Sequence, residues 1–344
     1  MVASPSRVTV VTLVLASLPV RNLLSIRNEN DRLRWQSKAV LLLVLPWTAA
    51  NVVLQSHWWF TQVPSVAWTA LGISAIFGLI VWKMRAGTAG AALTGALITA
   101  SLMFSTTKYP YEWSWLHGGL MPLLAVFLLT WGATKIGRAK KERMGTAESK
   151  RGRNAAQVAA NLGVAALASF PFEAITPDKN LANLLGAVTT FAALAALAEA
   201  AADTVSSEIG QVLGGVPRLI TTLRRVEPGT DGGVTIAGTI AGVLAAAVVA
   251  AIGVFSANSG SPCGPNIQGC DVVRPGAVDF WLPIVVLTAS GSFGLLVDSL
   301  LGATVERKGW INNDAVNFLS TLSAPFLLAI LFAVFVLALK SKGF

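Results

Sequence analysis

Residues 234–255 read VTIAGTIAGVLAAAVVAAIGVF, an apolar run that contains no charged side chain. A helix needs about 20 such residues to cross a bilayer, because each residue advances it by about 1.5 Å through a core about 30 Å thick. Runs of this kind follow one another along the 344-residue chain. The sequence therefore predicts a bundle of helices embedded in a membrane.

The amino-acid composition agrees with a membrane fold. Hydrophobic residues make up 54% of the chain and charged residues only 12%, about half the charged fraction of a soluble domain. The short run Val8–Val20 is either a first crossing or an interfacial helix, and the sequence leaves this open. We expect an all-α, polytopic transmembrane bundle of about nine to ten spans, the nine longer ones being Ala39–Gln55, Val66–Trp82, Gly87–Phe104, Gly118–Ala133, Ala155–Ser169, Leu181–Ala202, Val234–Phe255, Val278–Leu301 and Val316–Leu339.

Lys and Arg are distributed unevenly between the two sides of the predicted bundle. The segments 21–38, 83–86, 135–153, 203–233 and 303–315 hold 20 of the 26 Lys and Arg, and the positive-inside rule places these segments in the cytoplasm. The net charge of +9 is thus a topology signal, and we expect no nucleic acid partner. We predict an integral membrane protein with a cytoplasmic working face, in the bacterial inner membrane or in a plastid or endoplasmic reticulum membrane of a eukaryote.

The character of the predicted spans changes near residue 153. Earlier spans are generic and rich in Trp, whereas later spans carry polar and acidic residues at their cytoplasmic ends. We divide the chain into an N-terminal membrane-associated extension with the first spans, residues 1–60, and a catalytic membrane domain, residues 61–344. Cys263 and Cys270 share a polar loop on the opposite side, where a disulfide and two free thiols both remain open.

An acidic cluster continues the apolar run that ends at Ala202. Glu199, Asp203 and Glu208 are carboxylates at the end of a membrane helix, which is costly unless they face water, a cation or a partner base. Mg²⁺ binds carboxylate oxygens together with substrate phosphates. We predict a Mg²⁺ site formed by Asp203, Glu208 and Asp298, the last being an ionisable residue inside a later apolar run. The alternative is an acidic helix end exposed to the cytosol.

A glycine-rich loop precedes the apolar run 234–255. It reads RRVEPGTDGG at residues 224–233 and does not match the GxxxxGK[ST] pattern of a P-loop. Backbone N–H groups ahead of a helix N-terminus bind phosphate, and arginines add bidentate contacts; turn formation and topology signalling are the alternatives. Asp231 is a candidate proton acceptor. The predicted nucleotide or phosphate contacts in this loop are Arg224, Arg225, Thr230, Gly232 and Gly233.

Amide side chains form two further sets on the same predicted side. Asn313 and Asn317 lie four residues apart on one helix face and are candidate nucleotide contacts, with helix capping as the alternative for the 312–314 segment. A second stripe lies on the span that begins near residue 155, where hydrogen bonding between helices is the alternative to substrate contact. The candidate substrate contacts are Gln157, Asn161 and Ser207.

Five motifs in the later part of the chain resemble a known family. They are GRNAAQVAANLG at 152–163, ADTVSSEIG at 202–210, LITTLRRVEPGTDGGVTIAGTIAG at 219–242, GLLVDSLLGATVE at 294–306 and INNDAVNFLST at 311–321. In this order they are similar to the transmembrane protein 19-like family, also called domain of unknown function 92, over roughly residues 66–340. That family includes the plant phytyl-phosphate kinase of tocopherol synthesis, and it is distantly similar to polyprenol kinases and phosphatidate cytidylyltransferase.

The resemblance implies a prenyl-phosphate kinase that converts phytyl or geranylgeranyl phosphate to the diphosphate, with CTP as co-substrate and Mg²⁺ as cofactor. Asp203, Asp231 and Asp298 are then the catalytic candidates, and Arg224 or Arg225 replaces a lysine of the related kinases' loop. The alternatives are a CTP-dependent cytidylyltransferase acting on a lipid phosphate, a membrane transporter with charges near the bilayer midplane, and a non-catalytic scaffold. The expected partners are the bilayer, a prenyl phosphate and a nucleotide, while the oligomeric state stays open.

Overall fold

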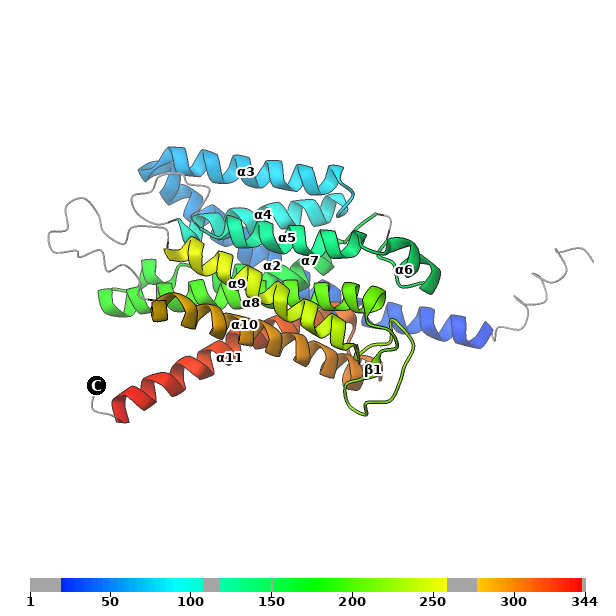
Figure 1. The fold of residues 1–344 in the computed structure, drawn as a ribbon. Coiled ribbons are helices and arrows are strands. Elements are labelled where there is room, and N and C mark those ends of the chain that lie inside the picture. Colours follow the sequence, from blue (N-terminus) through cyan, green and yellow to red (C-terminus); the bar gives the residue numbers. More distant parts are fainter. Residues whose placement is uncertain (1–19, 108–117, 150, 259–276, 342–344) are drawn as a thin grey trace, which may run out of the picture.

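The computed structural model describes residues 20–107, 118–149, 151–258 and 277–341, and they fold almost entirely as helices (Figure 1). The predicted all-α fold is confirmed. A two-residue hairpin pairs β1, Arg218–Leu219, with β2, Gly233–Val234, and a π-helical turn, Gly302–Glu306, follows α10. The helices are α2 Val20–Gln62, α3 Pro64–Lys83, α4 Ala89–Thr106, α5 Leu120–Lys135, α6 Arg138–Met144, α7 Ala155–Ala168, α8 Lys179–Leu213, α9 Ile236–Asn258, α10 Ala277–Leu301 and α11 Asn313–Ser341, with a 3-10 helix at Phe172–Ile175.

Seven helices in the described part of the chain are long and apolar enough to cross a membrane, namely α2, α3, α4, α8, α9, α10 and α11. All nine longer predicted spans correspond to helices, but α5 has 16 residues and α7 has 14, fewer than the roughly 20 that a crossing needs. Gly137, at φ 62°, follows α5, and the chain turns by 63° into α6. Residues 8–19 of the first predicted run, and Cys263 and Cys270, lie outside the described residues.

Helix α8 packs against α5, α7, α9, α10 and α11. Its buried stretch 193–202 consists mainly of alanine, so neighbouring backbones approach it closely. Glycines of the facing helices lie in this space. A Cβ at Gly242 of α9 would lie 2.7 Å from the carbonyl oxygen of Ala202, and a Cβ at Gly291 of α10 would lie 3.0 Å from the carbonyl carbon of Ala198. This packing holds the polar C-terminal half of α8 against α9 and α10.

A buried lysine joins the bent α5–α6 pair to α8. The Lys141 side chain is 1% exposed, and its Nζ donates to the carbonyl oxygens of Ala133 and Thr134 at 3.0 and 2.9 Å. It also forms a salt bridge with Glu208 of α8, whose Oε1 accepts a hydrogen bond from Thr134 Oγ1 at 3.2 Å. Lys141 therefore satisfies free carbonyl groups at the C-terminus of α5, where the helix dipole is negative.

Replacing Lys141 with Met is expected to destabilise the folded protein by about 3 kcal/mol, because Glu208 would keep a largely buried charge without its partner. The measurement is the unfolding midpoint of the purified protein in detergent. Lys140→Met is the matched control, since Lys140 is exposed and donates to the carbonyl oxygen of Val212 at the surface. Equal midpoints for the two variants would contradict a structural role for the buried lysine.

Helix α2 belongs to the same bundle, although the predicted domain boundary at residue 60 falls near its end. It packs against α3, α4, α7 and α11. Gln36 Nε2 donates to the carbonyl oxygen of Trp310 at 2.9 Å, and Ser37 Oγ donates to Asp314 Oδ2 at 2.6 Å. These bonds fix α2 to the turn that leads into α11.

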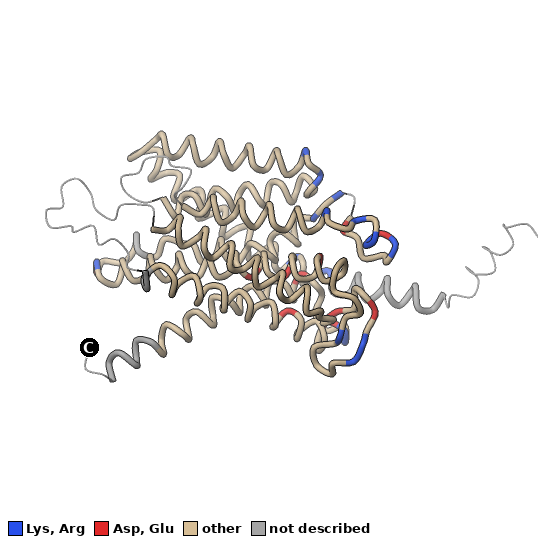
Figure 2. The backbone as a smooth tube through the Cα atoms, in the orientation of Figure 1, with Lys and Arg blue, Asp and Glu red and all other residues tan. Residues whose placement is uncertain are grey.

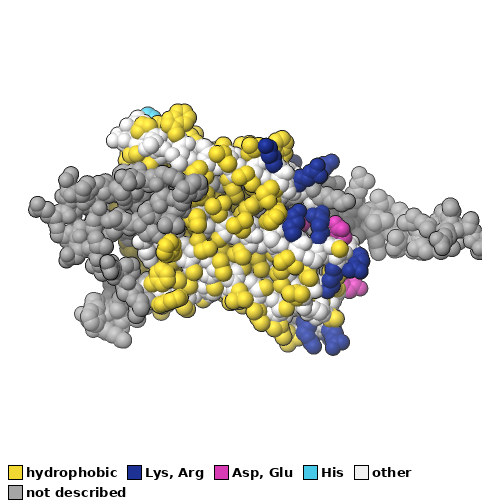
Figure 3. All heavy atoms as spheres, turned by 45° about the horizontal axis from the view of Figure 1, so that its top comes forward, with side chains coloured by type: hydrophobic (Ala, Val, Ile, Leu, Met, Phe, Trp, Pro, Cys, Tyr) yellow, Lys and Arg dark blue, Asp and Glu magenta, His cyan; other side chains and the backbone are white. Residues whose placement is uncertain are grey.

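Most of the described charged residues gather at one end of the bundle, as Figure 2 shows. The hairpin, the C-terminal ends of α8 and α10, and the start of α11 all lie at this end (Figure 1). The surface between the two ends is covered mainly by hydrophobic side chains on the face drawn in Figure 3. The acidic, loop and amide segments that the sequence places on one side of the membrane therefore do share one end of the molecule.

Candidate functional site

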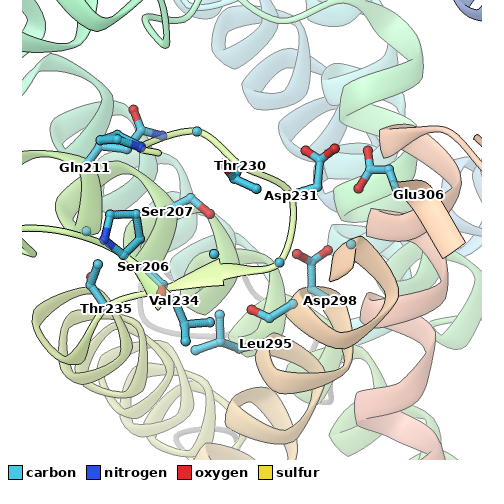
Figure 4. A pocket seen from close by; sticks show the side chains of 18 of the residues that line it. Ser206, Ser207, Gln211, Thr230, Asp231, Val234, Thr235, Leu295, Asp298 and Glu306 are labelled. Atoms are coloured by element: carbon cyan, nitrogen blue, oxygen red, sulfur yellow. The ribbon is translucent and has the colours of Figure 1, made fainter. Parts of the chain in front are cut away.

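A cavity of about 260 Å³ lies at the charged end of the bundle (Figure 4). It is bounded by the C-terminal part of α8, the loop between β1 and β2, and the junction of α10 with the π-helical turn. Among the described residues, its lining includes three carboxylates and no Lys or Arg. The polar side chains that line it are Ser206, Ser207, Gln211, Thr230, Asp231, Thr235, Asp298, Ser299, Glu306 and Asn313.

Two carboxyl groups meet beside this cavity. Asp203 of α8 and Asp298 of α10 lie close enough for each to act electrostatically on the other. Asp203 is buried, and Oδ1 of Asp298 is a buried atom with no hydrogen-bond partner among the described residues. Two carboxylates this close repel each other unless a proton or a cation lies between them. The unpartnered oxygen of Asp298 is therefore open to a proton or a cation.

A further acidic residue, Glu199, lies about one helical turn before Asp203 on α8. Glu199 is 1% exposed, and Thr321 of α11 donates to its Oε2 at 2.6 Å. Gly294 of α10 makes room for it, because a Cβ there would lie 2.3 Å from Glu199 Cγ. Oε1 of Glu199 has no partner in the part of the chain that the structure describes. Glu199 thus extends the group of acidic side chains from the paired aspartates into the bundle.

Two more carboxylates, Asp231 and Glu306, lie near each other at the cavity (Figure 4). Glu306 follows Asp298 by eight residues, a spacing that in a regular α-helix turns the two side chains about 80° apart around the helix axis. The π-helical turn adds one residue, as the 3.3 Å bond from Arg307 N to Gly302 O indicates, and Glu306 returns to the cavity. Burial raises the pKa of Asp231, and the nearby Arg307 opposes this rise by favouring the carboxylate.

The loop between β1 and β2 presents its backbone to the cavity. Gly229 and Gly232 have φ angles of 85° and 72°, a left-handed conformation that other residues rarely adopt. Gly232 also touches the π-helical turn, because a Cβ there would lie 2.4 Å from Ala303 N. The N–H groups of Asp231 and Gly232 donate to no described backbone oxygen. The loop therefore offers donors for an anion close to the carboxylates.

Helix α9 begins directly after this loop. Thr235 Oγ1 accepts a hydrogen bond from the N–H of Gly238 at 3.1 Å and caps the helix, and Val234 and Thr235 both line the cavity. Free N–H groups and the positive end of a helix dipole favour phosphate, whereas the carboxylates repel it. A divalent cation bound between the phosphate and the carboxylates would resolve this conflict, because both of these negative groups attract it.

The carboxylates can be tested for their fit to Mg²⁺. No group of three His, Cys, Asp or Glu side chains among the described residues is arranged to hold a metal ion by itself. Mg²⁺ commonly uses one or two protein carboxylates and takes its remaining oxygens from substrate phosphates and water. The Asp203–Asp298 pair, with its unpartnered oxygen, fits that smaller donor set.

The structure brings together the predicted residues of α8, the loop and α10, with three exceptions. Arg224 and Arg225 are exposed and do not line the cavity. Glu208 lies away from the cavity and is paired with Lys141. Asp298 lines the cavity, as do the predicted residues Ser207, Thr230, Asp231, Gly232, Gly233 and Asn313, whereas Asp203 is not a lining residue and lies beside Asp298.

The predicted amide contacts are divided among several roles. Gln157 forms a capping box with Asn154 at the start of α7, with bonds of 3.0 and 2.8 Å. Asn161 is buried, and its Oδ1 accepts a hydrogen bond from Nδ2 of Asn317 at 3.5 Å. Asn312 caps the first turn of α11. Helix capping and contact between helices therefore account for these side chains in the structure.

Three charged residues near the cavity have no assigned role in the prediction, although Glu199 belongs to the predicted acidic cluster and Arg153 to the stripe at the start of the span near residue 155. Arg153 Nη2 donates to Thr204 Oγ1 at 3.1 Å, and its charge acts on Asp203. Glu306 reaches the cavity only because of the π-helical turn, which the sequence does not indicate. Glu199 stands within an alanine run, and the cost of a carboxylate there is the signal that identifies it.

Comparison with known proteins places the chain in a family. A family model described as integral membrane protein DUF92 matches residues 72–325, which include every residue that lines the cavity. The chain is 32% identical over 260 residues to an uncharacterized membrane protein of Methanocaldococcus jannaschii, covering 73% of this chain and 87% of the relative.

Two plant proteins are also similar. The chain is 32% identical over 242 residues to Protein PGR of Arabidopsis thaliana, covering 60% of this chain and 79% of that protein. It is 26% identical over 258 residues to Protein VTE6, chloroplastic, of the same plant, covering 71% and 66%. No solved structure matches the chain significantly. The protein belongs to the DUF92 family of integral membrane proteins.

Proposed function

We propose that this membrane protein is a prenyl-phosphate kinase, which transfers the terminal phosphoryl group of CTP to a prenyl monophosphate such as phytyl or geranylgeranyl phosphate. The observation that carries the proposal is the Asp203–Asp298 pair beside a glycine-rich loop, at the charged end of an apolar bundle. Similarity to Protein VTE6, together with the motif resemblance to phytyl-phosphate kinase, supports a prenyl chain as the lipid.

The nucleotide is proposed to bind in the 260 Å³ cavity. Asp203 and Asp298 would hold Mg²⁺, which would neutralise the charge of the donor phosphates. The backbone of residues 230–233 and the N-terminus of α9 bind the phosphate oxygens. Asn313 lines the same cavity and is assigned to the nucleotide. Arg224 and Arg225 lie in the same loop but are exposed and do not line the cavity, so the proposed nucleotide site does not include them.

The proposed reaction balances without a covalent enzyme intermediate. A phosphate oxygen of the prenyl monophosphate attacks the terminal phosphorus of CTP and forms a new P–O bond. The bond from that phosphorus to the β-phosphate oxygen breaks, and CDP leaves with the electron pair. The attacking phosphate is largely ionised near pH 7, because its second pKa is about 6, so Asp231 needs to accept only a residual proton. Most of the rate acceleration in phosphoryl transfer comes from positioning the reactants and stabilising their charge.

The working face is proposed to lie in the cytoplasm, or on the equivalent side of an organelle membrane. The charged end of the bundle (Figure 2) carries the cavity and most of the described Lys and Arg. The positive-inside rule assigns such an end to the side from which the protein inserts. CTP and Mg²⁺ would reach the cavity from the same side.

The proposal is tested with purified full-length protein in lipid nanodiscs, supplied with Mg²⁺, CTP and geranylgeranyl monophosphate. We expect geranylgeranyl diphosphate and CDP in equal amounts, and slower turnover when ATP, GTP or UTP replaces CTP. Release of pyrophosphate with a CDP-linked lipid would instead identify a cytidylyltransferase. Absence of any nucleotide consumption with phytyl, geranylgeranyl and farnesyl phosphates would overturn the kinase assignment.

A further inference from the structure

A second cavity, of about 110 Å³, lies between α3, α4, α5 and α7. Its walls are mainly apolar and include Phe77 and Val81 of α3, Leu123 and Phe127 of α5, and Leu162 of α7. The rings of Phe77 and Phe127 stand edge to face with centroids 5.3 Å apart. These walls suit a hydrocarbon chain.

Cations line the same cavity at the charged ends of the helices. Arg85 follows α3, Lys135 ends α5, Arg138 begins α6 and Arg153 precedes α7. Glu148 is the one carboxylate among the described lining residues. The lining is therefore strongly positive, the opposite of the acidic lining of the nucleotide cavity. Arg138 is also paired with Glu142 at 2.9 Å, and the like charges that remain on this lining are unfavourable alone and become favourable around an anion.

Two local features indicate that an anionic group completes this cavity. Nε1 of Trp131 is buried and has no hydrogen-bond partner among the described residues, although the side chain lines the cavity. Lys135 Nζ lies 5.8 Å from the centre of the same ring. The left-handed φ of 52° at Arg85 belongs to the turn that ends α3, where Ala86 N donates to the carbonyl oxygen of Val81 at 3.0 Å. Trp131 Nε1 and Lys135 Nζ each supply a donor for a phosphate.

Arg153 connects the two cavities. Its backbone is fixed, because its N–H donates to the carbonyl oxygen of Ala86 at 3.1 Å and its carbonyl accepts from Thr88 N at 2.9 Å. Its side chain lines the second cavity, donates to Thr204 and acts electrostatically on Asp203. An anion held by Arg153 therefore lies next to the acidic pair of the first cavity.

We infer that the second cavity binds the phosphate head and the first part of the chain of a single-chain lipid phosphate. The identity of the chain as a prenyl group rests on the proposed function. The cavity has a volume of about 110 Å³, which leaves room for the first part of one hydrocarbon chain and not for the paired chains of a bilayer phospholipid. Arg153 would hold the acceptor phosphate where a phosphoryl group bound at Asp203 and Asp298 can reach it.

The inference is tested by equilibrium binding to the full chain in detergent without nucleotide or Mg²⁺, followed by Trp fluorescence and by a radiolabelled lipid. The probes are geranylgeranyl monophosphate, geranylgeraniol and inorganic phosphate. We expect the monophosphate to bind at least about tenfold more tightly than either of the others, because only it uses both the cations and the apolar walls.

Two variants with matched controls separate the contribution of the lipid's phosphate head to binding from that of its hydrocarbon chain. Arg138→Gln should weaken monophosphate binding about tenfold and leave geranylgeraniol unaffected, whereas Arg143→Gln, exposed on the same helix, should change nothing. Gly95→Leu should weaken both lipids about tenfold, since Gly95 lines the cavity and a Cβ there meets nothing within 4 Å. Gly72→Leu has equally open surroundings outside the cavity and serves as its control.

The outcomes distinguish the site from the reaction. Equal binding of monophosphate by wild type, Arg138→Gln and Gly95→Leu would overturn the inference, as would equally tight binding of inorganic phosphate or geranylgeraniol. Tight binding that the variants weaken, without diphosphate formation, would support the lipid phosphate site and contradict the kinase activity. Diphosphate formation with an unchanged KM for the lipid in both variants would support the kinase activity and show that the acceptor lipid binds outside the second cavity.

Discussion

Replacing Asp203 with Asn is expected to lower the rate of prenyl diphosphate formation by a factor of about 100 to 1,000, the usual cost of removing one preorganised electrostatic contact to a transferring group. The substitution keeps the shape of the side chain and removes the charge that would hold Mg²⁺. Folding should not suffer, because the variant also removes the repulsion between Asp203 and Asp298. Initial rates with saturating CTP and lipid phosphate, together with the unfolding midpoint, measure both effects.

The control for this variant is Glu227→Gln. Glu227 is an exposed carboxylate in the loop between β1 and β2 and does not line the cavity, so its loss should leave the rate within about twofold, as surface substitutions usually do. A wild-type rate for Asp203→Asn would remove Asp203 from the metal site. A rate that falls only together with the unfolding midpoint would make its role structural.

The second large effect is expected for Gly232→Ala. The added Cβ would lie 2.4 Å from Ala303 N, and the residue has a φ of 72°, so the loop must move away from the π-helical turn. A displacement of about 1 Å in a positioning segment costs about a hundredfold in rate. We therefore expect kcat to fall about a hundredfold, measured with CTP and geranylgeranyl monophosphate.

Gly145→Ala separates the effect of backbone strain from that of the contact. Gly145 has a similar φ of 73°, yet a Cβ there meets nothing within 4 Å. Its substitution should lower stability by about 1 kcal/mol, the cost of a left-handed conformation for a residue with a Cβ, and leave kcat unchanged. If Gly232→Ala behaves in the same way as Gly145→Ala, the loop contact does not matter for catalysis.

The positions of the helices could be predicted because the bilayer restricts what may cross it. Only segments that satisfy their own backbone hydrogen bonds and expose apolar side chains are stable there, and such runs are visible in the sequence. The lengths of α5 and α7 were harder to predict from the sequence. α5 ends before Gly137 in its left-handed conformation, and the buried Lys141 that joins the bent pair to α8 reads in the sequence as one more cation of a basic loop.

The acidic site was predicted in outline, and helical geometry explains where the prediction and the structure differ. Five residues of an α-helix correspond to a rotation of about 500°, so Glu208 points about 140° away from Asp203, while Glu199, four residues away, points in nearly the same direction. The regular rotation per residue does not apply to Glu306, because a π-helical turn separates it from Asp298. Local hydrogen bonds that only the fold reveals form this turn.

The loop arginines illustrate a second limit of sequence patterns. Arg224 and Arg225 precede a glycine-rich phosphate-type loop, but the hairpin fixes their direction. The carbonyl oxygen of Arg224 accepts a hydrogen bond from Leu219 N at 2.9 Å, and both side chains are exposed. The cation nearest the acidic pair is instead Arg153, from a segment 50 residues before Asp203 in the chain, and proximity of that kind depends on tertiary packing.

A structure of the full chain in nanodiscs with Mg²⁺ and a non-hydrolysable CTP analogue tests the nucleotide site most directly. The account predicts the triphosphate in the cavity between α8, the loop and α10, with one metal ion bound by Asp203 and Asp298 and the phosphate oxygens against residues 230–233. A nucleotide bound among Arg85, Lys135 and Arg138, or a metal ion held without either aspartate, would contradict it.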